Sequence, residues 1–392
     1  MWEWLWRTFD ALARPGYGAA QRDKGVRAMR AVIFSETTRP IEVAEVDLAR
    51  PGPGEVRVRI SAAGVCGSDL HVRRGDWQVP VPLVMGHEGS GVVAEVGPGV
   101  TGLAEGDHVV LSWVAPCGNC RFCRAGHEAR CEVAAAVDAS GTLQDGTTRL
   151  SRNGETLYHY LGVSSFAEEA VVPASGAIKV RDDAPLDTIA LIGCAVATGV
   201  GAVRNTAAME PGSVVAVIGC GGVGLSVVQG ARLCGAERII AMDIRAEKTA
   251  LARKFGATDE IDVKTTDAAD ALRELAPDGV DYAFDAIGMT TTTEQAIRML
   301  GLGGAAVVVG LPPEGAYARF DPLTLATTDQ RILGSNYGSV RPAIDIPTLV
   351  EYYMEGQLFL EDLISARRPL AEAAASLDEL ESGMALRTLL IP

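Results

Sequence analysis

At 392 residues the chain is too long for one ordinary hydrophobic core and is about right for two domains. Its 50 acidic and 35 basic residues give a formal charge of −15, which argues against nucleic acid or another polyanion as a partner. It has no run of about 18 apolar residues, so we expect no membrane span.

Residues 1–29 are expected to form an N-terminal extension. Its apolar side chains share one face at helical spacing: Trp2, Leu5, Trp6, Phe9, Leu12 and Ala13. This pattern favours a short docking helix or a loosely ordered extension, with a membrane-surface or partner-docking role as the alternative. Glu3, Arg7 and Asp10 interrupt the apolar stretch that a signal peptide requires. We therefore expect a cytoplasmic protein, in which stable disulfides are rare.

Three separate segments carry side chains that can bind a metal or move a proton. They are GVCGSDLH with Cys66, Ser68, Asp69 and His71, GHEGSGVVAEVG with His87 and Glu88, and LIGCAVATGVGAV with Cys194. Two cysteines and one histidine leave the fourth position of tetrahedral zinc open, as catalytic sites require. Taken singly, Cys194 is also compatible with a small buried hydrophobe and His87 with a core histidine. Spacing alone does not bring the three segments together.

The segment CGNCRFCRAGHEARC, residues 117–131, concentrates four cysteines: Cys117, Cys120, Cys123 and Cys131. Four thiolates at this spacing are typical of a tetrahedral zinc site with no open position, so the predicted site is structural. A redox C-x-x-C pair and an iron–sulfur cluster are the alternatives.

The segment GSVVAVIGCGGVGLSVVQGARLCGAERIIAMDI, residues 212–244, predicts a strand, a glycine-rich loop, a helix and a second strand. Gly219, Gly221 and Gly224 form G-x-G-x-x-G, which lets the backbone approach a pyrophosphate at the helix N-terminus. Asp243 ends the second strand, where a carboxylate binds ribose hydroxyls and repels a 2′-phosphate. The pattern predicts NAD binding rather than NADP, although Arg245 lies close by.

Further strands are predicted at VDYAFDAIG, residues 280–288, and AAVVVGLPP, residues 305–313, with helical stretches between them. This alternation indicates an α/β fold with a doubly wound parallel sheet. Cys220 and Cys234 lie within this part and are expected to be structural.

In family order, these motifs resemble the zinc-dependent alcohol dehydrogenases of the medium-chain dehydrogenase/reductase superfamily from about Ala31 onward. The resemblance implies a β-rich GroES-like catalytic domain over residues 30–195 and 336–392, with the structural zinc lobe at 117–131. A Rossmann NAD-binding domain would occupy residues 196–335. The segment 141–162 looks like the loop of the long dimeric members, which implies a homodimer.

The resemblance also implies roles for individual residues. Cys66, His87 and Cys194 would bind a catalytic zinc, with Asp69 holding His87 and Glu88 behind the metal. Ser68 and His71 would form a proton relay through the nicotinamide ribose. The expected cofactor contacts are Gly219, Gly221, Gly222, Val223, Gly224, Asp243, Lys248, Thr198 and Arg387. The expected substrate pocket is lined by Trp77, Trp113, Tyr160, Leu161 and Leu311.

The expected activity is therefore reversible, NAD-dependent oxidation of an alcohol to an aldehyde or ketone, with two zinc ions per chain. The aromatic pocket residues favour aromatic, terpenoid or longer aliphatic alcohols, and primary ones by analogy. A thiol-adduct formaldehyde dehydrogenase is the alternative enzyme, for which Arg73 and Arg74 offer basic side chains. A catalytically silent binding protein on the same scaffold is an alternative of another class. Gly67 replaces the Arg or His of several family members, which predicts weaker NAD binding and faster NADH release.

Overall fold

The computed structural model describes residues 25–264 and 266–392. The helix expected within residues 1–24 lies outside the described residues. The first strand, β1 (Arg27–Phe34), begins inside the range expected for the N-terminal extension.

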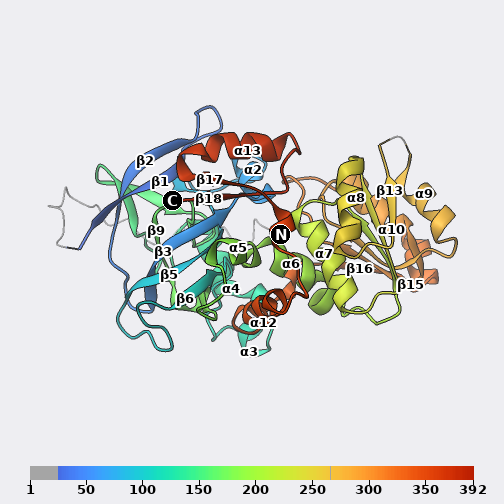
Figure 1. The fold of residues 1–392 in the computed structure, drawn as a ribbon, viewed down its shortest axis with the longest axis horizontal. Coiled ribbons are helices and arrows are strands. Elements are labelled where there is room, and N and C mark those ends of the chain that lie inside the picture. The colour runs from blue at the N-terminus through green and yellow to red at the C-terminus, as the bar shows by residue number, and fades with distance from the viewer. Residues whose placement is uncertain (1–24, 265) are drawn as a thin grey trace.

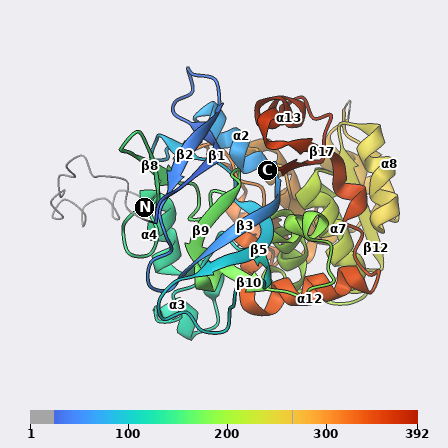
Figure 2. The same cartoon turned by 60° about the vertical axis from the view of Figure 1, so that its left-hand side comes forward.

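One part of the molecule is built from two β-structures (Figures 1 and 2). The first is a closed barrel in the order β1–β2–β7–β8–β4, whose other strands are β2 (Glu42–Leu48), β7 (Leu150–Arg152), β8 (Glu155–His159) and β4 (Leu83–Val84). The second is a sheet in the order β10–β6–β5–β3–β18–β17, with β9 also paired to β3. Its strands are β3 (Glu55–Gly64), β5 (Glu88–Val96), β6 (His108–Leu111), β9 (Glu169–Pro173), β10 (Ala177–Lys179), β17 (Ile364–Pro369) and β18 (Arg387–Ile391).

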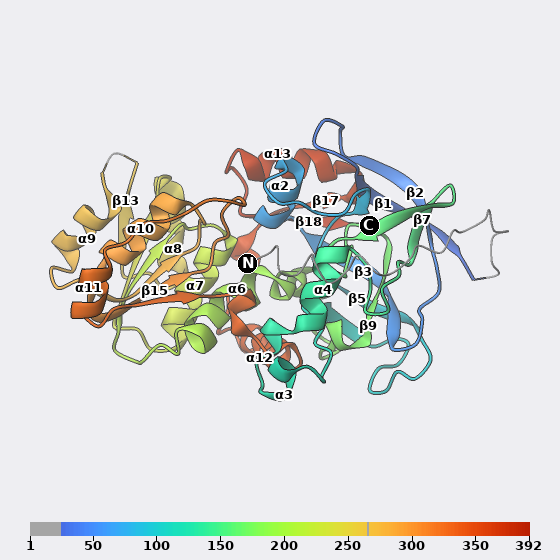
Figure 3. The ribbon, with the colours of Figure 1, turned by 180° about the vertical axis from the view of Figure 1, so that it is seen from behind.

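The last strand of the chain returns to this second sheet. In β18, Leu389 pairs with Gly64 and Leu390 with Ala63 at the end of β3. Because β3 leads directly into Cys66, this pairing brings Arg387 beside the first metal-ligating segment. The helix that precedes β18, α13 (Ala373–Glu381), lies next to α2 (Gly67–Arg74) from each direction of view (Figure 3).

The other part contains a six-stranded parallel sheet in the order β13–β12–β11–β14–β15–β16. Its strands are β11 (Val214–Ile218), β12 (Arg238–Asp243), β13 (Asp259–Asp262), β14 (Val280–Asp285), β15 (Leu300–Val308) and β16 (Arg331–Gly334). The helices of this part are α7 (Gly222–Leu233), α8 (Ala246–Phe255), α9 (Ala268–Leu275), α10 (Thr290–Arg298) and α11 (Pro322–Thr327). Numbered along the chain, the strands run 3-2-1-4-5-6, the order of dinucleotide-binding folds. The strand–loop–helix–strand prediction for residues 212–244 is confirmed by β11, α7 and β12.

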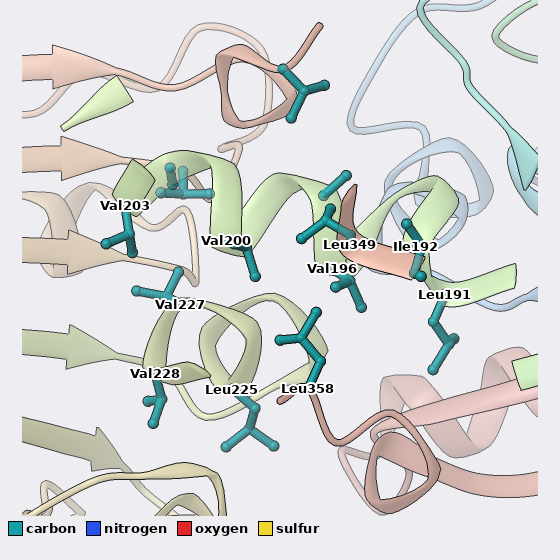
Figure 4. Close-up of a cluster of buried hydrophobic side chains, with 14 of the residues drawn as sticks. Leu191, Ile192, Val196, Val200, Val203, Leu225, Val227, Val228, Leu349 and Leu358 are labelled. Atoms are coloured by element: carbon teal, nitrogen blue, oxygen red, sulfur yellow. The ribbon is translucent and has the colours of Figure 1, made fainter. Parts of the chain in front are cut away.

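Between the two parts lies a core of aliphatic side chains (Figure 4). It draws Val196 and Val200 from α6 (Ala195–Gly201), Val227 from α7 and Leu349 from α12 (Pro342–Met354). Among the described residues, no single helix is long and apolar enough to cross a membrane, and only the bent pair Leu186–Gly193 with Ala195–Thr206 passes by length and composition. The buried packing of α6 against α7 sets the position of Cys194, which immediately precedes α6.

The remaining helices lie around the metal-ligating segments. Short α5 (Leu186–Ile189) precedes the Cys194 turn, while α3 (Arg121–Arg124) and α4 (Glu132–Ser140) belong to the cysteine-rich region and the segment that follows it.

Candidate functional site

Cys66 and Asp69 are held by the start of α2. Cys66 is the N-cap residue, and Asp69 at the third helical position accepts a hydrogen bond from the Cys66 backbone N–H at 2.9 Å. This arrangement is a capping box, with a thiol in place of the usual hydroxyl. The sulfur and the carboxylate are therefore fixed relative to each other by local backbone geometry.

His87 lies between β4 and β5 and is 1% exposed. Its Nδ1 atom lies 3.4 Å from Asp69 Oδ1, and its ring meets the Tyr160 ring edge-on with 5.4 Å between centroids. Neither ring nitrogen of His87 has a hydrogen-bond partner among the described residues. With Nδ1 facing Asp69, Nε2 is the nitrogen that is available to a metal.

Cys194 sits in the turn before α6, with φ −141° and ψ −75°. The Tyr337 hydroxyl donates to the carbonyl oxygen of Gly193 at 2.6 Å, which anchors this turn from a distant part of the chain. This hydrogen bond therefore helps to fix the buried turn that carries the Cys194 sulfur.

These three segments converge. The ligand atoms of Cys66, His87 and Cys194 all lie within 4.8 Å of one another, and all three residues are buried. Two sulfurs bound to one tetrahedral zinc at about 2.3 Å lie roughly 3.8 Å apart, so the spacing fits zinc. The unpartnered His87 nitrogens support the same interpretation, because buried polar atoms without partners are rare.

Charges around the three ligands favour a cation among them. Burial raises the pKa of Glu88 to about 7, and although burial alone lowers it, Asp69 raises the pKa of His87 to about 10. A hydrogen bond from Cys194 and the charge of Arg387 lower the pKa of Cys66 well below its usual range. The Cys66 thiolate and the Asp69 carboxylate thus stabilise a positive charge between them, which a bound zinc ion would supply once His87 and Cys194 give up their protons.

Arg387 and Glu88 lie behind the ligands. Arg387 Nη2 donates to Cys66 Sγ at 3.6 Å, and its Nε lies 3.5 Å from Glu88 Oε1. Glu88 Oε2 accepts from the Ala195 N–H at 2.8 Å, so this buried carboxylate joins two of the ligand-bearing segments.

The two predicted relay residues lie on one face of α2, three residues apart. Ser68 Oγ is 3.9 Å from Cys66 Sγ, beside the ligand cluster. His71 is partly exposed and its Nδ1 lies 2.8 Å from Asp76 Oδ2. Ser68 is therefore the inner member of the pair and His71 the outer one.

The glycine-rich loop leaves room for an anion at the start of α7. Gly219 has φ +93°, and a Cβ on Gly224 would lie only 1.7 Å from the Gly219 carbonyl oxygen. At the N-cap residue Gly221, a Cβ would meet no described heavy atom within 4 Å. A Cβ at Gly222 would meet the Arg387 guanidinium at 2.8 Å, so Arg387 faces the loop as well as the ligands. Val223, the remaining predicted loop residue, follows on α7. The loop fits a dinucleotide pyrophosphate.

Asp243 is fixed at the end of β12, next to this loop. Its Oδ2 accepts from the Cys220 N–H at 2.8 Å and its Oδ1 from the Arg245 N–H at 3.0 Å. The Arg245 guanidinium instead binds the Ser382 carbonyl oxygen and lies 3.4 Å from Glu247. Lys248, a predicted cofactor contact, is the third residue of α8. Thr198, another predicted contact, is partly buried, whereas every other residue of α6 is buried.

The four cysteines of residues 117–131 form a second cluster, with all four sulfurs within 4.8 Å of one another. Backbone N–H groups point at the sulfurs, among them Cys120 to Cys117 at 3.3 Å and Cys123 to Cys120 at 3.5 Å. The hydrogen bond from the Cys123 N–H is the largest cause that lowers the pKa of Cys120 to about 6. None of the eight cysteines forms a disulfide in the part of the chain that the structure describes. Four cysteine sulfurs would fill all four positions of a tetrahedral zinc, so this cluster fits a structural zinc site.

The five predicted pocket residues lie in different surroundings. Tyr160 is buried beside His87, and its hydroxyl donates to the Ser68 carbonyl oxygen at 3.1 Å. Trp113 and Leu161 line a small cavity together with α4. Trp77 stacks on His71, while Leu311 is 49% exposed.

Arg73 and Arg74, the basic residues that the thiol-adduct alternative needs, are both paired with α13. Arg73 Nη2 lies 2.5 Å from Asp378 Oδ1, and Arg74 Nε lies 2.8 Å from Glu381 Oε1. Acidic side chains therefore already compensate both guanidinium groups.

Sequence reasoning missed three residues near the site. Asp76 could have been found, because it lies five residues after His71, just beyond the C-terminal glycine of α2. Tyr337 gave no local signal, since it contacts Gly193 across 144 positions. Asp138 on α4 is half-buried, and burial raises its pKa to about 6 while His87 opposes the shift.

Comparison with known proteins identifies relatives over most of the chain. Residues 52–182 match the alcohol dehydrogenase GroES-like domain family, and residues 222–353 match the zinc-binding dehydrogenase family. S-(hydroxymethyl)glutathione dehydrogenases of several Escherichia coli strains are 40% identical over 365 residues, covering 92% of this chain and 99% of theirs.

Two solved structures are similar throughout. An alcohol dehydrogenase zinc-binding domain protein from Burkholderia ambifaria is 39% identical, with a TM-score of 0.90 over 94% of this chain and 100% of that one. Benzyl alcohol dehydrogenase from Acinetobacter calcoaceticus is 34% identical, with a TM-score of 0.88 over 93% of this chain and 99% of that one.

Proposed function

The chain belongs to the zinc-dependent alcohol dehydrogenases of the medium-chain dehydrogenase/reductase superfamily, and we propose that it oxidises an alcohol reversibly with NAD. The family makes it an oxidoreductase with a GroES-like domain and a Rossmann domain. The identity of the coenzyme and of the alcohol are the finer parts of the proposal.

The observation that carries the proposal is the convergence of Cys66, His87 and Cys194 beside the Ser68 hydroxyl. Three protein ligands are the number that a catalytic zinc uses, because the fourth position must accept substrate. In the other cluster, four cysteines leave no such position. We propose one catalytic and one structural zinc per chain.

Zinc bound by the three ligands would act as a Lewis acid on the alcohol oxygen, and NAD would accept the hydride. The side chains of this protein would orient the ligands, stabilise the thiolate and move the proton. Asp69 orients His87, and Arg387 stabilises the Cys66 thiolate while facing the glycine-rich loop. Ser68 takes the alcohol proton at Oγ, and His71 passes it toward solvent.

NAD is proposed over NADP because of Asp243. Its carboxylate is held at the end of β12 by two backbone N–H groups, where it would repel a 2′-phosphate. Arg245 is the side chain that could bind such a phosphate, but its guanidinium is engaged by Ser382 and Glu247. Lys248 and Thr198 are proposed as further cofactor contacts.

An aromatic or longer alcohol is the proposed substrate. Tyr160 lies edge-on to His87 and would contact a substrate held near the metal ligands. Trp113, Leu161, Trp77 and Leu311 would extend an apolar lining outward. The similarity to a benzyl alcohol dehydrogenase supports this substrate class.

The direct test is a panel of aryl, terpenoid and aliphatic alcohols assayed by NADH absorbance with NAD and with NADP. We expect activity with NAD, and loss of it in Cys66→Ala through metal loss and in Ser68→Ala through loss of proton transfer. Near-wild-type turnover in both variants would refute the assignment.

The second candidate is oxidation of a hydroxymethyl–thiol adduct, which the names of the 40% identical relatives favour. That reaction would need cations for the carboxylates of the thiol, but Arg73 and Arg74 are already paired with Asp378 and Glu381. Activity with formaldehyde that appears only when a low-molecular-weight thiol is added would make this candidate the correct one.

A silent binding protein is disfavoured because every predicted ligand and relay residue is present. Metal analysis separates this alternative from an enzyme. Two zinc ions per chain support the enzyme, whereas one would support the binding protein.

We further propose a homodimer formed through the edge strand β16. Large apolar side chains are exposed on the segments that precede β16 in the chain: Leu302 (84%), Tyr317 (86%), Phe320 and Leu323. The Gly303 N–H donates to Thr328 O, which brings Leu302 to α11 beside this edge. An open sheet edge with exposed apolar side chains is a surface that a second copy can cover. Light scattering of Leu323→Glu tests this proposal, with a shift from dimer to monomer as the expected result.

The proposed division of the chain places residues 30–195 and 336–392 in the catalytic domain and 196–335 in the NAD-binding domain. Pairing of β18 with β3 supports assigning the C-terminal segment to the catalytic domain.

A further inference from the structure

We infer that Asp76 is a positioning residue for His71, which selects the ring nitrogen that receives the substrate proton. The inference rests on the proposed function, because it concerns the outer residue of the proposed proton path. It goes beyond that function by adding a carboxylate to the path.

The end of α2 brings the two side chains together. Gly75 follows the helix in the left-handed conformation with φ +75°, and its N–H donates to Val72 O. The Asp76 N–H then donates to His71 O at 2.9 Å, the second bond of a Schellman motif. This motif sets the residue after the glycine beside the one five positions earlier. Asp76 therefore meets His71 because of how the helix ends.

The side chains complete the contact. His71 Nδ1 and Asp76 Oδ2 are 2.8 Å apart, and the side chains are 20% and 23% exposed. A carboxylate only accepts hydrogen bonds, so the geometry assigns the proton to Nδ1. Nε2 of the neutral ring is then the free acceptor. It takes one proton from the path that begins at Ser68, and the resulting imidazolium, balanced by the Asp76 carboxylate, releases one proton to water.

A second set of contacts fixes the ring plane. Trp77 stacks on His71 with centroids 4.4 Å apart and an interplanar angle of 18°. Its indole N–H donates to the Pro312 carbonyl oxygen at 3.1 Å. The imidazole is thus restrained by the carboxylate at its edge and the indole on its face.

Asp76 itself is held by the loop that follows β15. The Glu314 N–H donates to Asp76 O at 3.1 Å, and the Gln78 N–H donates to Glu314 Oε1 at 3.2 Å. The nearby Arg73 and Arg74 are paired with α13, so acidic groups there already engage their charges. The Asp76 carboxylate therefore remains directed at His71.

The kinetic test uses the full-length, zinc-loaded enzyme and its best alcohol. Because general base catalysis contributes about 100-fold or more, we expect Asp76→Ala to lower kcat about tenfold, with KM for the alcohol within twofold of wild type. Added imidazole should restore part of the rate of Asp76→Ala, because a small base replaces a misoriented one. The double variant with His71→Ala should fall no further than His71→Ala alone. Asp182→Asn, which removes an exposed carboxylate elsewhere, is the matched control and should leave kcat unchanged.

Three results would overturn the inference: an Asp76→Ala kcat within twofold of wild type, no response of that variant to imidazole, or independent losses that multiply in the double variant. Asp76→Asn, which keeps a hydrogen-bond acceptor, is the variant to use if the alanine variant does not fold, and we expect a roughly threefold loss from it. Nitrogen NMR of the five histidines tests the inference without turnover. His71 should carry its proton on Nδ1 in the wild type and lose that preference in Asp76→Ala. A wild type that shows this preference but oxidises no alcohol would refute the proposed function alone, and absence of the preference would refute the inference alone.

Discussion

The Tyr337 hydroxyl donates a 2.6 Å hydrogen bond to the carbonyl oxygen of Gly193, the residue before the buried ligand Cys194. Tyr337 is itself 2% exposed, so Tyr337→Phe leaves the Gly193 carbonyl without this donor in a buried environment. Such a loss costs about 1–2 kcal/mol. We expect urea unfolding to show this decrease, and a chelator to remove one zinc faster from the variant than from wild type.

Tyr352→Phe is the matched control, because Tyr352 is only partly buried and its hydroxyl makes no hydrogen bond to another described residue. Its unfolding and zinc release should match wild type. Equal zinc release from all three proteins would show that Tyr337 contributes to folding without supporting the ligand turn.

The four-cysteine cluster predicts a separable zinc. Cys120→Ser removes one of four ligands whose sulfurs lie within 4.8 Å of one another. Because a structural zinc contributes directly to folding, the variant should contain one zinc per chain by mass spectrometry and melt at a lower temperature.

Cys234→Ser provides the comparison for this experiment, since Cys234 is a partly buried cysteine at the end of α7 and belongs to neither cluster. It should retain two zinc ions. Two zinc ions in Cys120→Ser would contradict the assignment of the cluster.

Features whose residues are contiguous in the sequence were predicted, and features whose residues come from distant segments were harder to predict. The glycine-rich loop and its strands are contiguous, so the periodicity of residues 212–244 predicted β11, α7 and β12. Cys66, His87 and Cys194 come from three segments, and only resemblance could join them before the fold was known. Tyr337 depends on a contact across 144 positions, which no local pattern reveals, whereas the spacing of His71, Gly75 and Asp76 at a helix end is a local signal that could have been used.

Gly67 is the position where the chain departs from several family members. A Cβ built on Gly67 meets no heavy atom within 4 Å among the described residues, so Gly67→Arg fits at the first position of α2. A guanidinium there would add a charged contact to the cofactor pyrophosphate. We expect the Kd of NADH to fall about fivefold by fluorescence titration, with slower NADH release.

Gly67→Met controls for side-chain length without charge and should leave the Kd within twofold of wild type. An unchanged Kd in Gly67→Arg would show that the departure from the family pattern does not weaken cofactor binding.

His159 predicts how stability changes with pH. Its side chain is buried, its Nε2 accepts from the Arg149 N–H at 3.1 Å, and burial together with the charge of Arg149 lowers its pKa to about 3. The unfolded chain binds a proton near pH 6.5 while the folded chain does not, so stability is lost as the pH falls from 6.5 toward 3. Between pH 6.5 and 5 this group removes up to about 2 kcal/mol.

His159→Gln cannot gain this proton, so its free energy of unfolding should fall less than that of wild type over the same pH range in urea titrations. Loss of zinc at low pH affects both proteins and cancels in the comparison. His127→Gln, which changes an exposed histidine, should follow wild type. Parallel curves for wild type and His159→Gln would mean that His159 is protonated in the folded protein, and that the buried site around Arg149 accommodates the charge.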